Sequence, residues 1–201
     1  QNALEKAKIG VVGDDDLLAS LFVLSASALG MSQIVAFAPA LKTQLVETAQ
    51  RLNPGFGLLH IEGFYTHPAL DEVFKGCDLI VDLSHYGLCN KLLLEKGYRE
   101  RIPVIRGFCF EQNDERGFKV FTSLRGREWQ ELEQIISDQN LPGYHFDDGV
   151  LDTIITGIAL EETKTILMGG RVSDEIICYR RKKLNASRIQ PRLLVVGAGA
   201  L

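Results

Sequence analysis

Short β-branched runs alternate with longer segments of helical spacing along this chain. An apolar run over residues 9–12 reaches Gly13, and an apolar segment over residues 17–29 ends at Gly30, where a helix C-cap is expected. Further strands are predicted at 34–37, 58–61, 78–83 and 103–105, and helices at 1–7, 41–52, 68–74, 87–96, 127–136 and 149–169. This order predicts an α/β fold, a Rossmann-like, doubly wound and mainly parallel sheet between two helical layers in a three-layer αβα arrangement.

The second half of the chain adds an antiparallel edge to the predicted sheet. Residues 118–122 alternate between apolar and polar types after a charged turn, which is typical of an edge hairpin. Short β-like runs follow around residues 176–179. The helix predicted at 17–29 is apolar on almost every side, so we expect it to be buried by the sheet and also by a second layer or a partner.

The turn after the first strand has unusual chemistry for a nucleotide-binding fold. Working turns of this kind carry G-x-G-x-x-G, because glycines let the backbone approach a pyrophosphate at the helix N-terminus. Here Gly13 is followed by Asp14, Asp15 and Asp16. Carboxylates favour the helix dipole but repel a polyphosphate, since two like charges roughly 4 Å apart cost about 4 kcal/mol at an effective dielectric constant of ~20. We therefore expect the loop to be occupied by its own side chains.

The end of the second predicted strand lacks the acid that such sites use. In dinucleotide and ATP sites of this architecture an Asp or Glu near that position holds the ribose hydroxyls. Here the positions are Phe37, Ala38 and Pro39. The sequence thus predicts that this part of the chain binds no nucleotide.

Composition and charge exclude several other functions. The 201 residues are 46% apolar and 24% charged, which fits one α/β domain, or one domain and a fragment of another. The net charge of −4 gives no electrostatic footprint for nucleic acid, and the basic run at 180–183 (RRKK) is typical of a solvated face. The sequence has neither an apolar run of about 18 residues nor a secretory leader pattern, so no membrane contact is expected.

The cysteines Cys77, Cys89, Cys109 and Cys178 include no C-x-x-C pair. This spacing argues against a structural zinc site and fits scattered, reduced thiols in the cytoplasm. Cys89 and Cys109 have no His or acid at a recognisable spacing, so we expect packing roles. We expect neither catalytic residues nor a metal site in this chain.

The tail of the chain repeats its opening. KIGVVGDDDLL stands near the start and RLLVVGAGAL at the end, where Gly197 and Gly199 supply glycines that the first copy lacks. A repeat at this separation indicates tandem domains rather than a solenoid. We predict a first Rossmann domain over residues 1–170, a linker over 171–191, and the first strand and phosphate loop of a second, truncated domain over 192–201.

Five phrases in order resemble the ThiF/MoeB/HesA superfamily, which includes the ubiquitin-activating enzymes. They are QNALEKAKIGVVG, RLNPG, DLIVDLSHYGLCNKLLLEKG, IPVIRGFCFEQNDERGFKVF and GVLDTIITGIALEETKTILMGG, between residues 1 and 170. The resemblance implies an adenylyltransferase that uses ATP and Mg²⁺ to adenylate the C-terminal glycine of a ubiquitin-like or sulfur-carrier protein.

The resemblance also implies which site residues have been lost. The phosphate loop falls on residues 13–18, without its later glycines, and the segment with an Asn-x-x-Arg pair is absent. Lys42 aligns with the family's lysine after a one-residue slip. The pattern D-x-T-D-N becomes residues 82–86 (DLSHY), which keep Asp82 but replace the metal-binding acid by His85. His85 alone is expected to be a hydrogen-bonded structural residue.

These losses make the chain similar to the non-catalytic half of a tandem activating enzyme, and leave a vestigial nucleotide site at Gly13, Asp14–Asp16, Lys42, Asp82 and His85. The resemblance implies that this half serves as a scaffold, that it pairs with a second ThiF-like domain or a homodimer partner, and that ATP and Mg²⁺ belong to the second domain. A stand-alone protein-binding or regulatory module is the alternative. A nicotinamide-dependent oxidoreductase is disfavoured, because it needs the missing glycine loop and ribose acid.

Overall fold

The computed structural model describes residues 2–112, 114–124, 135–141, 143, 148–172 and 175–182. Its centre is a seven-stranded sheet in the order β3-β2-β1-β4-β5-β6-β7. The strands are β1 (Lys8–Val12), β2 (Gln33–Ala38), β3 (Gly57–Glu62), β4 (Leu79–Asp82), β5 (Val104–Gln112), β6 (Glu115–Ser123) and β7 (Ile177–Lys182). β3, β2, β1, β4 and β5 pair in parallel, whereas β6 and β7 continue the sheet antiparallel.

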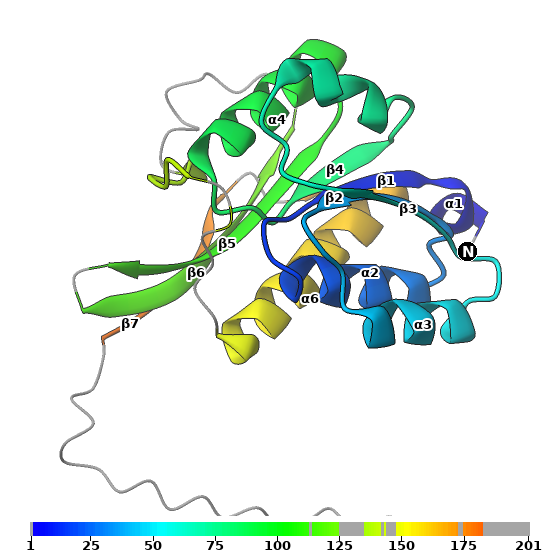
Figure 1. Ribbon diagram of the computed structural model, residues 1–201, viewed down its shortest axis with the longest axis horizontal. Helices are drawn as coiled ribbons and strands as arrows, with labels where there is room; N and C mark the ends of the chain where they lie inside the picture. The colour runs from blue at the N-terminus through cyan, green and yellow to red at the C-terminus, as the bar shows by residue number, and fades with distance from the viewer. Residues whose placement is uncertain are drawn as a thin grey trace, which may run out of the picture.

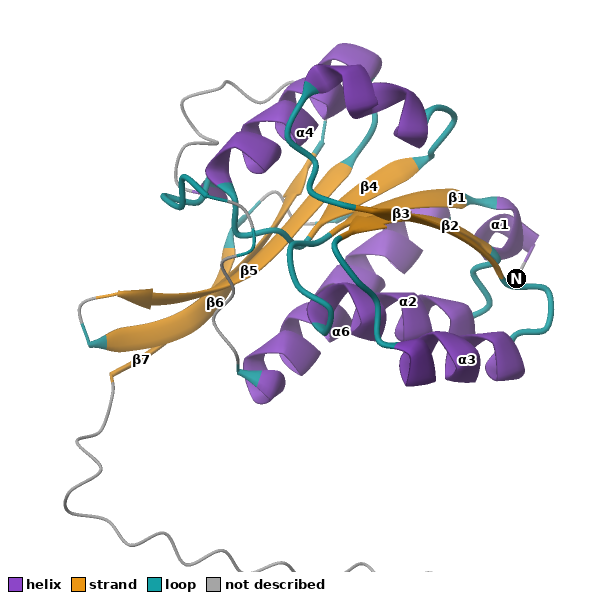
Figure 2. Ribbon diagram, viewed as in Figure 1, coloured by secondary structure: helices purple, strands orange, loops and turns teal. Residues whose placement is uncertain are grey.

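Helices cover both faces of this sheet (Figures 1 and 2). One face carries α2 (Leu18–Ala28), α3 (Thr43–Leu52) and α6 (Gly149–Leu167), and the other carries α4 (Gly87–Glu100). The short α1 (Asn2–Lys6) precedes β1 and contacts α6. The predicted α/β Rossmann-like fold, with its three layers, mainly parallel sheet and antiparallel edge, is confirmed.

Each face of the sheet has its own hydrophobic core. Val11, Phe22 and Ile155 belong to the core under α2 and α6, and Phe74, Ile80 and Leu93 to the core under α4. α2 lies between α3 and α6, and Leu18, Phe22 and Val23 of this helix are buried within this chain. Gly10 is needed in β1, because a Cβ there would lie 2.7 Å from the Phe74 ring.

The structure corrects the sequence prediction at several elements. Residues Pro68–Phe74 form a 3-10 helix, η1, instead of an α-helix: the segment is short, and Gly76 ends it with a φ of +74°. β5 continues to Gln112 because it pairs with β6 along its whole length. β6 is not the edge strand, since β7 pairs outside it.

β7 lies inside the segment 171–191 that the sequence assigns to a linker. All its residues are exposed, including Arg180–Lys182 of the basic run. Most of the helix predicted at 127–136 and the whole second glycine loop, with Gly197 and Gly199, lie outside the described residues.

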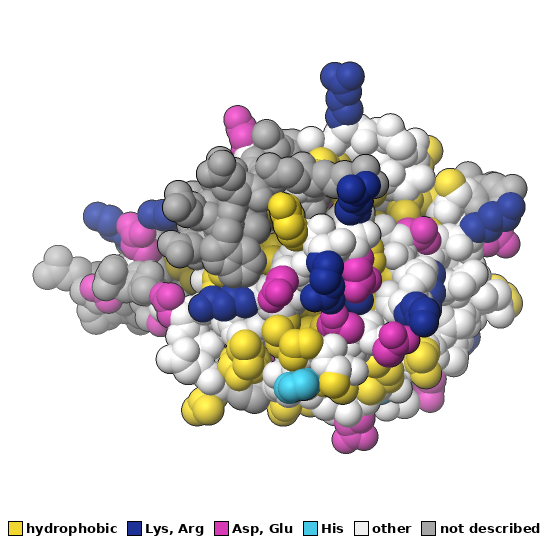
Figure 3. Space-filling model, turned by 90° about the horizontal axis from the view of Figure 1, so that it is seen from above, with side chains coloured by type: hydrophobic (Ala, Val, Ile, Leu, Met, Phe, Trp, Pro, Cys, Tyr) yellow, Lys and Arg dark blue, Asp and Glu magenta, His cyan; other side chains and the backbone are white. Residues whose placement is uncertain are grey.

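The surface mixes charges of both signs. On the face shown in Figure 3, which α4 covers, basic and acidic side chains are interspersed rather than gathered by sign. Within the described residues, no helix is long and apolar enough to cross a membrane.

Candidate functional site

The candidate site lies at the carboxyl ends of β1 and β4, which are adjacent parallel strands with Val12 opposite Asp82. In open α/β sheets this end of the strands is where ligands bind. The loop after β1 carries Gly13 to Asp16, and the loop after β4 carries His85. Gly13 is required here, because a Cβ at this position would lie 2.9 Å from the Cβ of Ala19 and separate α2 from the strand.

Asp15 occupies the N-terminus of α2. Its Oδ1 accepts hydrogen bonds from the backbone N–H groups of Leu17 and Leu18, both at 2.7 Å. These are the amides that a bound phosphate would use in a glycine-rich loop, and the helix dipole favours any anion placed there. The prediction that the loop is occupied by its own side chains is therefore confirmed at this position.

Asp14 connects the two loops. Its Oδ2 accepts the backbone N–H of His85 at 2.7 Å, and its Oδ1 lies 3.4 Å from Nδ1 of the same residue. Both side chains are buried, with 2% and 3% of their surfaces exposed for Asp14 and His85 respectively. His85 is hydrogen-bonded within the fold, as expected, but its partner comes from the other loop.

Asp16 points to a different partner from the other two acids. Its Oδ2 lies 2.6 Å from Nζ of Lys42, and both side chains are about half exposed. The backbone N–H of Lys42 donates to Oγ of Ser20 at 2.8 Å, which joins the start of α3 to α2. Of the predicted site residues, Lys42 and Asp16 thus form a surface ion pair at the margin of the site.

Asp82 belongs to a buried polar network under the loop after β4. Its Oδ1 accepts the backbone N–H and the hydroxyl of Ser84, at 3.0 and 2.7 Å, and its Oδ2 accepts the Asn90 amide at 2.8 Å. Nε of Arg106, a fully buried residue, lies 3.6 Å from Oδ2 of Asp82. These hydrogen bonds hold the Asp82 side chain inside the protein, and the guanidinium of Arg106 balances its negative charge.

The Arg106 guanidinium completes this network and was not predicted. It donates to the carbonyl oxygens of Ile135 and Ser84 and to Oδ1 of Asn90, the first at 3.1 Å and the last at 3.0 Å. Its carbon Cζ lies 4.4 Å from the centroid of the Phe108 ring. One signal was present: Arg106 directly follows the apolar strand predicted at 103–105, and an arginine that is buried with a strand requires buried acceptors.

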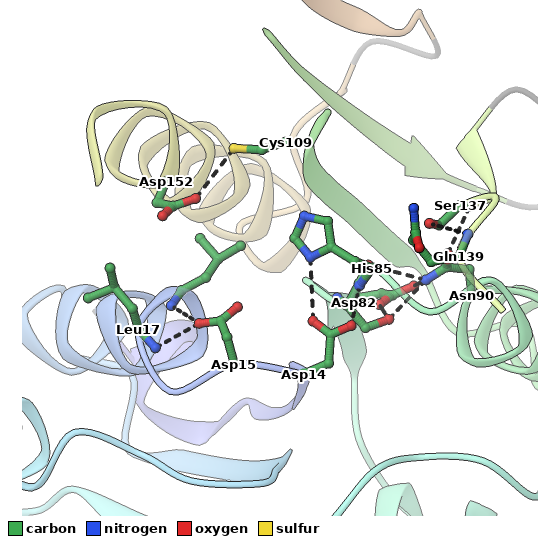
Figure 4. A network of polar contacts seen from close by, with 12 residues as sticks. Asp14, Asp15, Leu17, Asp82, His85, Asn90, Cys109, Ser137, Gln139 and Asp152 are labelled. Carbon is green, nitrogen blue, oxygen red and sulfur yellow. Dashed lines mark hydrogen bonds and ion pairs between the residues drawn. The ribbon is translucent and has the colours of Figure 1, made fainter. Parts of the chain in front are cut away.

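A second buried pair lies next to the loops (Figure 4). Sγ of Cys109 on β5 donates to Oδ1 of Asp152 on α6 at 3.4 Å. Burial, and after it the charge of Asp152, raises the pKa of Cys109, and burial raises the pKa of Cys89 well above its ordinary value. Neither thiol forms a thiolate nucleophile near neutral pH, so the predicted packing roles fit.

The position of the missing ribose acid is apolar. Phe37 and Ala38 at the end of β2 are buried, and the Phe37 ring packs edge-on against Tyr65 with centroids 5.8 Å apart. Nε2 of His60 lies 2.9 Å from the carbonyl oxygen of Ala38. An aromatic contact therefore stands at the end of β2, where a nucleotide site would need a carboxylate.

One group in the site has the composition of a metal ligand set. Asp14, Asp15 and His85 each offer one ligand atom, and these atoms all lie within 4.8 Å of one another. The sequence separates the residues by 71 positions and predicts no metal site, so the tertiary structure alone brings them together.

Comparison with known proteins gives a fold likeness and no sequence family. No protein-family model matches the chain, and no curated protein sequence matches it. Among solved structures, PaaA superposes with a TM-score of 0.63 at 12% identity, over 90% of this chain and 74% of PaaA. E. coli MccB bound to ATP gives 0.63 at 10% identity, over 90% of this chain and 65% of MccB. The Microcin C7 biosynthetic enzyme MccB in complex with N-formylated MccA gives 0.64 at 12% identity.

At these identities the likeness concerns the fold alone. This chain shares the fold of the PaaA and MccB structures, and it spans about two thirds of the length of the MccB chains that it matches.

Proposed function

We propose that this chain is an inactive adenylation domain of the ThiF/MoeB/HesA type, which binds no ATP itself and acts as a scaffold for an active second domain. The observation that carries the proposal is the Asp15 carboxylate on the first amides of α2. The phosphate position of the fold is taken by a side chain of the same charge.

Electrostatics explain why ATP should not replace this side chain. A phosphate would have to displace two charge-assisted hydrogen bonds and then approach Asp14 and Asp16 as well. Each like-charge contact at roughly 4 Å costs about 4 kcal/mol at an effective dielectric constant of ~20. The end of β2 does not offset this repulsion by binding the ribose, because Phe37 and Ala38 have no side-chain acceptor for its hydroxyl groups.

Calorimetric titration of this chain with Mg-ATP tests the proposal. We expect no saturable binding up to millimolar nucleotide. The variant Lys42→Met serves as the site control, because Lys42 is the exposed cation at the margin of the site. Micromolar binding that Lys42→Met weakens would contradict the proposal, since it would place ATP in the loop that we consider closed.

The proposal assigns ATP and Mg²⁺ to the domain that begins near residue 192. In a protein that continues past Leu201, Gly197→Val should abolish ATP–pyrophosphate exchange, because a side chain there would block the approach of phosphate to the backbone. Asp15→Asn in the same protein should leave the exchange rate within about twofold. Loss of exchange on Asp15→Asn, with the fold intact, would contradict the scaffold role.

The proposed partners are a second ThiF-like domain, or a homodimer partner, and a ubiquitin-like or sulfur-carrier protein whose terminal glycine is adenylated. The fold likeness to MccB, which was crystallised with MccA, supports a protein partner. The free cysteines fit a cytoplasmic location. A carrier protein that binds this chain equally well without any second domain would favour the alternative, a stand-alone binding module.

A further inference from the structure

Main-chain hydrogen bonds orient the two carboxylates of the possible ligand set, which consists of Asp14, Asp15 and His85. Each carboxylate is oriented through one oxygen by backbone N–H groups: Asp14 by that of His85, and Asp15 by those of Leu17 and Leu18. The other oxygen of Asp14 faces Nδ1 of His85, and the other oxygen of Asp15 points toward the His85 ring (Figure 4). Two main-chain segments thus aim two carboxylates and one imidazole at a common point.

The spacing of these atoms matches coordination by a small divalent ion. Carboxylate and imidazole ligands lie about 2.0–2.2 Å from Zn²⁺, so two ligands of a tetrahedral site are about 3.4 Å apart. The Asp14 Oδ1 to His85 Nδ1 distance is 3.4 Å, and each of the three residues has a ligand atom within 4.8 Å of ligand atoms of the other two. Small side-chain shifts would bring all three atoms into the first coordination sphere.

Burial and charge give a reason for a cation at this point. Asp14 and His85 are almost completely buried, and Asp15 is half-buried. Two carboxylates this close in a poorly solvated place repel each other, and buried charges are stabilised by partners or by metal ions. Among the described residues, Lys42 pairs with Asp16 and Arg106 with Asp82.

We propose that Asp14, Asp15 and His85 bind a divalent first-row transition metal ion, with Zn²⁺ as the best match. An imidazole nitrogen beside two carboxylates suits Zn²⁺ and its neighbours, whereas Mg²⁺ prefers an octahedral shell of oxygens. The bound ion ties the loop after β1 to the loop after β4, at the position that a nucleotide-binding relative would give to phosphate. This proposal departs from the expectation, drawn from the sequence, that the chain has no metal site.

This inference concerns the same loop as the proposed function but stands on ligand geometry, so the two can fail separately. Absence of Zn²⁺ binding would leave the proposed loss of ATP binding intact. Mg-ATP binding in the loop would contradict the proposed function even if Zn²⁺ also bound.

The test is titration of the chelator-treated, metal-free chain with Zn²⁺ in competition with a chromophoric chelator. We expect one ion per chain, and at least tenfold weaker binding in Asp14→Asn and in Asp15→Asn. Asparagine keeps an oxygen for the backbone N–H groups and is nearly isosteric, so both variants should fold, which circular dichroism checks. Co²⁺ added to the unmodified chain should give the intense visible bands of a four-coordinate site.

Matched controls separate this set from other ligands in the chain. Asp16→Asn removes a carboxylate from the same loop but outside the set, and Cys178→Ser removes the exposed thiol. Both should leave Zn²⁺ affinity within twofold, as should His60→Gln. The proposal is overturned if Asp14→Asn and Asp15→Asn keep the unmodified affinity, if a control variant loses binding instead, or if the chain shows no saturable site for one ion.

Discussion

The loop after β1 and the last residue of β4 both place carboxylates at the same end of the sheet, yet these carboxylates have different partners. Asp82 faces a fully buried guanidinium, that of Arg106, and is part of the protein interior. Asp14 and Asp15 face backbone amides and an imidazole instead. A buried carboxylate paired with a buried guanidinium helps to hold the interior together, whereas the proposed ligand set pairs two carboxylates with an imidazole, the kind of group that binds a metal ion.

The same comparison shows how both regions satisfy their hydrogen bonds from within the chain. The network around Asp82 holds β4, β5 and the start of α4 together through side chains. The loop after β1 needs an acceptor for the amides of α2, and Asp15 supplies it from within the chain. The acceptors for these amides are thus side chains of the chain itself.

Arg106→Met should have the largest effect on stability. It leaves the Asp82 carboxylate buried without its cation, which costs about 3–5 kcal/mol. Chemical unfolding followed by circular dichroism measures this loss. Arg181→Met, at an exposed position of β7, is the control and should change stability little. A loss of stability below about 1 kcal/mol for Arg106→Met would mean that Asp82 does not depend on the Arg106 guanidinium, and would contradict the contrast drawn with Asp14 and Asp15.

Substitutions at Asp15 should have an intermediate effect. Asp15→Ala removes the acceptor of two α2 amides and should cost about 0.5–2 kcal/mol, whereas Asp15→Asn keeps an acceptor and should cost much less. Thermal or urea unfolding of the two variants in metal-free buffer measures the difference. Equal losses in both variants would show that the negative charge, rather than the hydrogen-bond acceptor, is what the helix N-terminus requires.

Lys42→Met should have the smallest effect. The Lys42–Asp16 pair is about half exposed, and exposed ion pairs contribute about 0–1 kcal/mol. We expect a change of less than about 0.5 kcal/mol, which raised salt concentration reduces further. Urea unfolding at low and high salt measures it. A loss comparable to that of Asp15→Ala would place Asp16 with the other two acids instead of at the margin.

Local patterns predicted the fold class because each strand and helix depends mostly on residues near it in the sequence. The apolar run before Gly13, the helix up to Gly30 and the alternation at 118–122 all lie in their expected elements. Pairing partners were harder to predict: β7 forms only against β6, whose residues lie about 60 positions earlier, and no local pattern specifies that register.

In the candidate site, too, contacts between residues close in sequence were predictable and contacts between distant residues were not. The carboxylate at the helix N-terminus was predictable, because Asp15 binds amides two and three residues away. The Asp82–Arg106 pair was not, since its members are 24 residues apart and meet only where β4 and β5 pair.

By itself, the sequence determined that the first glycine loop has carboxylates where phosphate-binding glycines would stand, because that conclusion needs only the order of residues 13–16 and the charge of their side chains. Only the tertiary structure decided what each acid does. The parallel pairing of β1 with β4 places Asp14 beside His85 across 71 residues, sends Asp16 to Lys42, and leaves Asp15 between the helix amides and the imidazole. Contacts over such separations follow from strand order, which no local pattern contains.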